Sequence, residues 1–141
     1  MTEDNRELVR RYLAAFNERD RETLRELLAE DVVEHGTHEE LQGVEAIESF
    51  LDEQFRAFPD YSGTTEAMVA EGDTVAVRYT VRGTHTGKYR NVDPTGHTVE
   101  WTGMGFYRIE DGRIAEIWLE ADRLGLLDQL EVLDPPAHLR V

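Results

Sequence analysis

The chain has 141 residues, of which 40% are hydrophobic, enough for one compact domain with a buried core. Thirty acidic residues against 15 basic ones give a net charge of −15, which argues against nucleic acids and anionic membranes as partners. No apolar run approaches the roughly 18 residues that span a bilayer, and no apolar signal-peptide core follows Met1, so we expect a cytoplasmic protein.

The first 60 residues predict three amphipathic helices. Residues 4–18 place their apolar side chains on one stripe, and Asp20 is expected to cap a short second helix. A short strand at 32–35 and a polar loop at 36–43 lead to a third helix over 44–58. Pro59 ends that helix, because proline disfavours helical backbone in the residue before it.

From Tyr61 onward the apolar residues alternate with period 2, which indicates strands. Gly72-Asp73 and Glu110-Asp111-Gly112 each separate two such runs and predict hairpin turns. The predicted strands cover 67–71, 74–85, 99–109 and 113–119, and a closing helix covers 123–133. Helices followed by an antiparallel meander predict an α+β fold, with three to four helices packed on one face of a strongly curved sheet. We expect a single domain over 1–141, with a C-terminal tail at 134–141.

The last predicted strand carries Glu116, Trp118, Glu120 and Asp122 at period 2, so these four side chains share one face of the sheet. Three acids and a tryptophan suit a cavity wall better than a dry core. We therefore expect this face to line a pocket.

Several short segments occur in a characteristic order: Phe58-Pro59-Asp60, Gly72-Asp73-Thr74-Val75, Gly83-Thr84-His85-Thr86-Gly87, Pro94-Thr95-Gly96 and Asp122-Arg123-Leu124-Gly125-Leu126-Leu127. With them the chain resembles, over roughly residues 6–130, the SnoaL-like polyketide and ester cyclases of the NTF2-like superfamily. The resemblance implies a cone of helices and curved, mainly antiparallel sheet that encloses a pocket, usually in a homodimer. It also implies intramolecular aldol chemistry on a small apolar carbonyl compound, with no cofactor.

Two residues are the catalytic candidates. In the cyclases that the chain resembles, an aspartate at the position of Asp122 is the general acid/base, and Trp118 would supply the apolar wall that raises its pKa. The alternative is that Asp122 only caps the helix beginning at Arg123. His35 is the second candidate, as a proton acceptor or hydrogen-bonding group, although a lone histidine is more often structural.

The other candidates are expected to contact the substrate. Tyr12 lies on the apolar stripe of the first helix. In ketosteroid isomerases a tyrosine at this place stabilises the enolate, and the position of their catalytic acid corresponds here to Glu34 or His35. The alternative is that Tyr12 is a core residue. His85 either lines the pocket mouth or organises the loop that follows it. Glu120 shares the face of Asp122, and Glu116 is read as a partner for Arg78 or Arg108. The substrate-contacting set is Tyr12, Trp118, Glu120, His85, Trp101 and Phe106.

A metal site is not expected, since His35-x-x-His38 lacks a well-spaced third ligand. The sequence thus favours a cofactor-independent cyclase or isomerase that uses Asp122 as acid/base, and activation of water is a less favoured variant. The alternatives are a non-catalytic binder of a small apolar molecule and a structural dimerisation module.

The charge also predicts an environment. Lys88 is the only lysine beside 14 arginines. Acid excess with so little lysine is typical of proteins adapted to molar intracellular salt, where the Debye length falls to about 3 Å and self-repulsion is screened. A GC-rich genome that favours arginine codons is the alternative explanation.

Overall fold

A computed structural model of the chain describes residues 2–36 and 39–133. It contains four helices: α1 (Thr2–Glu18), α2 (Arg21–Leu27), α3 (Val44–Ala57) and α4 (Arg123–Gln129). All four lie where the sequence predicts them, although α4 ends at Gln129 instead of residue 133. Asp20 caps α2 as expected, because its carboxylate accepts a hydrogen bond from the Thr23 N–H. The predicted tail at 134–141 and His38 lie outside the described residues.

Six strands form one mixed sheet in the order β2-β1-β6-β5-β4-β3. The strands are β1 (Leu28–His35), β2 (Glu40–Gln42), β3 (Ser62–Glu71), β4 (Thr74–Thr84), β5 (Thr98–Glu110) and β6 (Arg113–Ala121). Every neighbouring pair is antiparallel except β1 with β6, which is parallel. The sequence missed β2, which lies in the predicted polar loop and is only three residues long.

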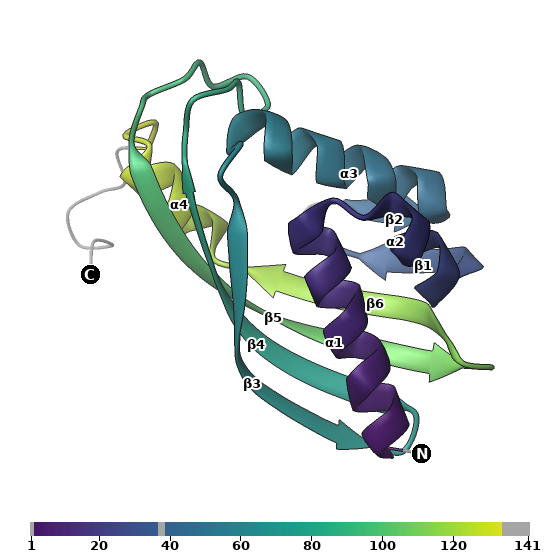
Figure 1. The fold of residues 1–141 in the computed structure, drawn as a ribbon. Helices are drawn as coiled ribbons and strands as arrows, with labels where there is room; N and C mark the ends of the chain where they lie inside the picture. The colour runs from purple at the N-terminus through teal and green to yellow at the C-terminus, as the bar shows by residue number, and fades with distance from the viewer. Residues whose placement is uncertain (1, 37–38, 134–141) are drawn as a thin grey trace.

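Helices α1, α2 and α3 cover one face of the strongly curved sheet, and α4 lies at its far end (Figure 1). The larger apolar core fills the space between these helices and the sheet, with Val9, Leu51 and Ile117 among its fully buried members. A smaller core around Phe58 joins the end of α3 to α4. The α+β class, with helices on one face of a curved and mainly antiparallel sheet, is therefore confirmed. No described helix is long and apolar enough to cross a membrane.

The strands β5 and β6 decide which side chains face the helices. On β5, Trp101 and Tyr107 are buried on the helix-covered inner face, whereas Phe106 is exposed on the outer face. On β6, a register shift next to Ile109 leaves Ile117 inside and Trp118 outside, paired with Phe106. Glu116, Trp118 and Glu120 do share one face, but it is the outer face. The expectation that this face lines a pocket is corrected, because the three helices cover the opposite face.

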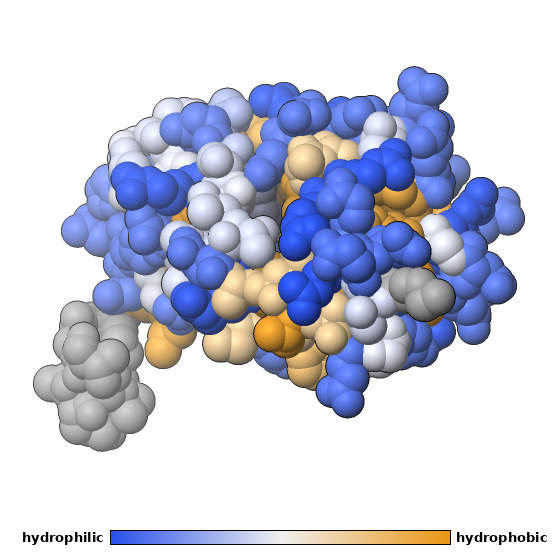
Figure 2. All heavy atoms as spheres, turned by 60° about the horizontal axis from the view of Figure 1, so that its bottom comes forward, coloured by the Kyte–Doolittle hydropathy of each residue, from blue (hydrophilic) through white to orange (hydrophobic). Residues whose placement is uncertain are grey.

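The outer face carries several exposed apolar side chains. Phe106 is 55% exposed and Met104 60%, and Trp118, which lies opposite Phe106 in the register, is 38% exposed. Figure 2, which brings the underside of Figure 1 forward, shows apolar residues gathered among hydrophilic ones on the surface. Apolar residues that neighbour one another on a surface are a common mark of an interaction site.

Candidate functional site

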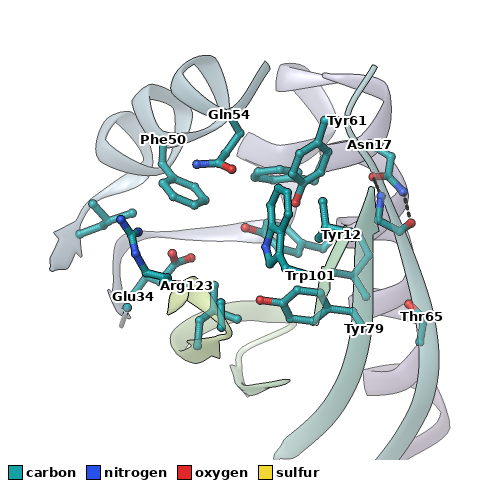
Figure 3. Close-up of a pocket in the computed structure, with 18 of the residues that line it drawn as sticks. Tyr12, Asn17, Glu34, Phe50, Gln54, Tyr61, Thr65, Tyr79, Trp101 and Arg123 are labelled. Carbon is teal, nitrogen blue, oxygen red and sulfur yellow. Dashed lines mark hydrogen bonds between the residues drawn. The ribbon is translucent and has the colours of Figure 1, made fainter. Parts of the chain in front are cut away.

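A cavity of about 150 Å³ lies between α1, α3 and the concave face of the sheet. Figure 3 shows its wall, with aromatic rings on one side and the carboxylate of Glu34 on the other. Residues from every element except α2 contribute, among them Tyr12 of α1, Glu34 of β1, Gln54 of α3, Tyr79 of β4 and Trp101 of β5.

Two glycines of β5 make room for this wall. Gly103 pairs with Tyr79 of β4, and a Cβ atom at Gly103 would collide with the Tyr79 hydroxyl group. A Cβ atom at Gly105 would lie 2.6 Å from Cδ2 of Leu119. Since both positions face inward, the absence of side chains lets Tyr79 and Leu119 lean over β5 and shape the cavity.

Four tyrosines surround the cavity: Tyr12, Tyr61, Tyr79 and Tyr107. Burial and the negative charge of Glu34 raise the pKa of each, that of Tyr79 to about 12. The hydroxyl groups therefore stay protonated and can donate hydrogen bonds. Figure 3 shows Tyr12, Tyr61 and Tyr79 pointing into the cavity, and no described residue accepts a hydrogen bond from any of the four. A bound ligand or water must satisfy them.

Glu34 is the buried acidic group of the cavity. It is 4% exposed, and its carboxylate points into the cavity (Figure 3). Burial, helped by the charge of Glu39, raises its pKa to about 7. No hydrogen bond reaches this carboxylate from residues 2–36 or 39–133. A carboxyl group that is half protonated near neutral pH, and that has no hydrogen-bond partner among the described residues, can both accept and donate a proton.

The sequence contains the signal that places Glu34 inside. Val32 and Glu34 lie two residues apart on β1 and therefore share a face, and Val32 is fully buried. The comparison with ketosteroid isomerases left Glu34 and His35 as equal candidates, and the catalytic prediction took His35. The structure separates the two, because neighbouring residues of a strand point to opposite faces.

Asp122 lies outside the cavity. It is exposed at the N-cap of α4, where its Oδ1 accepts a hydrogen bond of 2.8 Å from the Gly125 N–H. This is the capping role that the sequence offered as the alternative. Its chain neighbours Ala121 and Arg123 line the cavity, but Asp122 does not, so the geometry does not support a role as acid/base there.

His35 is on the outer face as well. Its Nε2 lies 2.6 Å from Glu116 Oε2, its Nδ1 lies 3.0 Å from Glu40 Oε1, and its ring stacks on Trp118 at 5.4 Å. The hydrogen bond to Glu116 is the main reason why the pKa of His35 is raised. Glu116 also pairs with Arg108 at 3.2 Å, one of the two arginines that the sequence suggested for it.

Of the six residues predicted to contact substrate, the structure brings two to the cavity, Tyr12 and Trp101. Trp118, Glu120 and Phe106 are exposed on the outer face. His85 is fully buried away from the cavity, where its Nδ1 accepts a hydrogen bond of 3.1 Å from the Thr95 N–H. His85 thus organises the loop that follows it, which was one of its two predicted roles.

Within the described part of the chain, no three potential metal-ligating side chains come together. The polar groups of the cavity include those of Glu34, Gln54, the tyrosines, Trp101 and two arginines, Arg90 and Arg123. Gln54 is 5% exposed, and Figure 3 shows its amide group directed toward the cavity. The arrangement suits recognition of a ring compound with oxygen substituents and proton transfer by Glu34.

Comparison with known proteins assigns the chain. Among solved structures, a proposed polyketide cyclase from Streptomyces antibioticus, IdmH, is 35% identical, with a TM-score of 0.81 over 91% of this chain and 99% of that one. A proposed hydroxylase from Streptomyces galilaeus, AclR, is 28% identical, with a TM-score of 0.86 over 95% and 100%. TsrD from Streptomyces laurentii is 28% identical, with a TM-score of 0.83 over 92% and 96%.

No curated protein sequence gives a significant match. The profile of the SnoaL-like polyketide cyclases matches residues 6–130, which is most of the chain. The chain belongs to the SnoaL-like polyketide cyclase family.

Proposed function

We propose that the protein is an enzyme that moves a proton to or from carbon next to a carbonyl group, as a cyclase or isomerase, with Glu34 as general acid/base. The observation that carries the proposal is the state of Glu34: buried in the cavity wall, without a hydrogen-bond partner among the described residues, and with its pKa raised to about 7. Glu34 takes the role that the sequence assigned to Asp122, because Asp122 caps α4 outside the cavity.

The chemistry balances without an oxidant or reductant. Ionised Glu34 accepts the proton, the C–H bond breaks, and its electron pair moves to the carbonyl oxygen to form an enolate. Protonated tyrosine hydroxyl groups such as those of Tyr12 and Tyr79 would donate hydrogen bonds to that oxygen. In a cyclase the enolate carbon then bonds to a second carbonyl carbon, and Glu34 returns its proton to the new alkoxide. In an isomerase Glu34 returns the proton to another carbon.

The size of the cavity and the names of the relatives support this class of reaction. A volume of about 150 Å³ is close to that of a cavity that holds one benzene ring. IdmH is named as a proposed polyketide cyclase, and cyclisation of a carbonyl-rich chain begins with such an enolate. We infer a substrate that places one ring or ring-forming segment in the cavity.

Deuterium exchange tests the proposal without knowledge of the natural substrate. The protein is incubated in D₂O with a small ketone such as 1-indanone, whose uncatalysed exchange is slow, and loss of the α-proton signal is followed by NMR. We expect the wild type to accelerate exchange. In Glu34→Gln the exchange rate should fall about 10²–10⁴-fold, because glutamine keeps the shape of the side chain but cannot accept the proton. Asp122→Asn is the matched control and should keep the wild-type rate.

Two results would contradict the proposal. Exchange that survives in Glu34→Gln and is lost in Asp122→Asn would restore Asp122 as the acid/base. Saturable ligand binding with no acceleration of exchange by the wild type would favour the alternative, a non-catalytic protein that binds a small apolar molecule in the same cavity.

We also propose that two copies pair through the outer sheet face, since a symmetric dimer would cover Met104, Phe106 and Trp118 on both copies. Sedimentation in molar KCl should give a dimer for the wild type and a monomer for Phe106→Glu, because burial of two added carboxylates at one interface is costly. A wild-type monomer at micromolar concentration would contradict the dimer. The net charge of −15 suits a cytoplasm rich in salt. High salt would screen the repulsion between two such negatively charged copies and so favour their pairing.

A further inference from the structure

Two arginines line the cavity in different surroundings. Arg90 is neutralised twice, since its Nη2 lies 3.0 Å from Glu39 Oε1 and its Nε lies 3.1 Å from Glu53 Oε1. Arg123, the first residue of α4, has no carboxylate within ion-pair distance in the part of the chain that the structure describes. Its guanidinium carbon instead lies 5.8 Å from the centre of the Tyr89 ring. Arg123 is thus a cation on the cavity wall without a counterion among these residues.

The nearby acids are otherwise occupied or too distant. The carboxylate of Asp122 accepts the hydrogen bond from Gly125 N–H that caps α4. Glu34 forms no ion pair with Arg123 in the described structure, and its pKa is raised by burial and by the charge of Glu39. Neither acid therefore serves as the partner of Arg123.

The Arg123 guanidinium also holds an unused donor. Its Nε atom is buried, and no described residue accepts a hydrogen bond from it. A buried donor without an acceptor is costly, so a state in which the guanidinium turns toward a bound oxygen is favoured. The rest of the wall adds donors as well, from the tyrosine hydroxyl groups, the Trp101 indole N–H and the Gln54 amide.

We propose that Arg123 determines specificity, and that it selects ring compounds that bear an ionised carboxylate. A guanidinium donates two parallel hydrogen bonds to a carboxylate, which neutral oxygen groups such as amides and esters accept less strongly. The protein has a net charge of −15, and its overall electrostatic field repels anions. Preferential binding of an anion would therefore have to come from a local cation such as Arg123. This inference deepens the proposed function, because it names a feature of the substrate. It rests on that function only to the extent that both use the same cavity.

Benzoate and benzamide provide a matched pair of probes, since they have the same ring and nearly the same shape but differ in charge. Their affinities are measured by calorimetry or by quenching of tryptophan fluorescence at pH 6. At that pH benzoate is ionised, because its carboxyl group titrates near 4, and Glu34 is mostly protonated. We expect the wild type to bind benzoate about tenfold more tightly than benzamide.

Three variants locate the source of this preference. Arg123→Gln should remove the preference for benzoate and leave the affinity for benzamide within about twofold. Arg123→Lys should retain part of it, since lysine keeps the charge but not the planar fork. Arg78→Gln makes the same change of charge at an exposed position of β4 and should retain all of it.

Equal affinity of the wild type for the two probes, or no binding of benzoate, would overturn the inference, as would a preference that survives in Arg123→Gln. The proposed proton transfer is tested separately. Glu34→Gln should abolish deuterium exchange and still prefer benzoate, so that failure of exchange and failure of carboxylate selection can be told apart.

Discussion

The two faces of the sheet carry similar residues in contrasting surroundings. On the inner face Glu34 has no hydrogen-bond partner among the described residues, and burial raises its pKa to about 7. On the outer face Glu116 is held by His35 at 2.6 Å and Arg108 at 3.2 Å, and the pKa of Glu116 is lowered, chiefly by the hydrogen bond to His35. A paired carboxylate is stabilised in its charged form, whereas a buried and unpaired one is ready to exchange a proton.

The tryptophans show the same contrast. Trp101 is 7% exposed on the inner face, and Trp118 is 38% exposed on the outer face. We expect Trp101→Ala to lower the free energy of unfolding by about 3–5 kcal/mol, because it removes the ring that packs against Phe58 and Tyr61. Trp118→Ala should cost the monomer about 1 kcal/mol or less. Urea unfolding of dilute protein measures both variants. Equal losses of unfolding free energy would mean that the two tryptophans are packed equally well on the two faces.

The pH dependence of exchange sharpens the assignment of the base. Glu34 must be ionised to accept a proton, so below its pKa of about 7 the rate should fall about tenfold per pH unit, and about 100-fold at pH 5. The pKa of His35, on the outer face, is also raised, chiefly by its hydrogen bond to Glu116. His35→Gln should therefore leave the profile unchanged. A shifted midpoint in that variant would tie the proton transfer to the outer face.

Stability should respond to the same group in the opposite sense. The folded protein holds the Glu34 proton more tightly than the unfolded chain, whose pKa is near the ordinary 4.5. The stability that this contributes is present below pH 4.5 and is lost as the pH rises through about 7. Glu34→Gln should accordingly raise the free energy of unfolding at pH 8 by about 1–3 kcal/mol. Melting curves at pH 5 and pH 8 measure it, and a variant that is less stable than the wild type at pH 8 would show that Glu34 has a partner.

The fold follows from the sequence more fully than the site does. Period 3.6 and period 2 locate the helices and the long strands, and Asp-Gly turns mark the hairpins. The three-residue strand β2 has too few positions to show a period, so it is read as loop. Tyr12 is predicted to contact substrate from the likeness to the first-helix tyrosine of ketosteroid isomerases, and Trp101 belongs to the same predicted set; both line the cavity.

The error at the site has one cause. Alternation shows that Glu116, Trp118 and Glu120 share a face, but it does not show which face the helices cover. The inner face of β6 carries Ile117 and Leu119, and helix-covered faces are the more apolar ones. In the same way, Val32 marks the inner face of β1. Glu34 lies two residues after Val32 and shares that face, whereas His35 does not, and this separates the two candidates.

Asp122 gives the smallest and most discriminating effect. Its Oδ1 accepts the Gly125 N–H at the start of α4, so Asp122→Ala should lower the free energy of unfolding by about 1 kcal/mol. Serine is also a good N-cap residue, so Asp122→Ser should keep most of the stability that Asp122→Ala loses. Neither variant should change the exchange rate more than about twofold, because a cap on the outside of the cone touches no substrate. A residue that acts as the acid/base would behave in the reverse way: serine would keep the helix intact and still abolish exchange. Measured together, urea unfolding and deuterium exchange for these two variants assign Asp122 either to the helix or to the reaction.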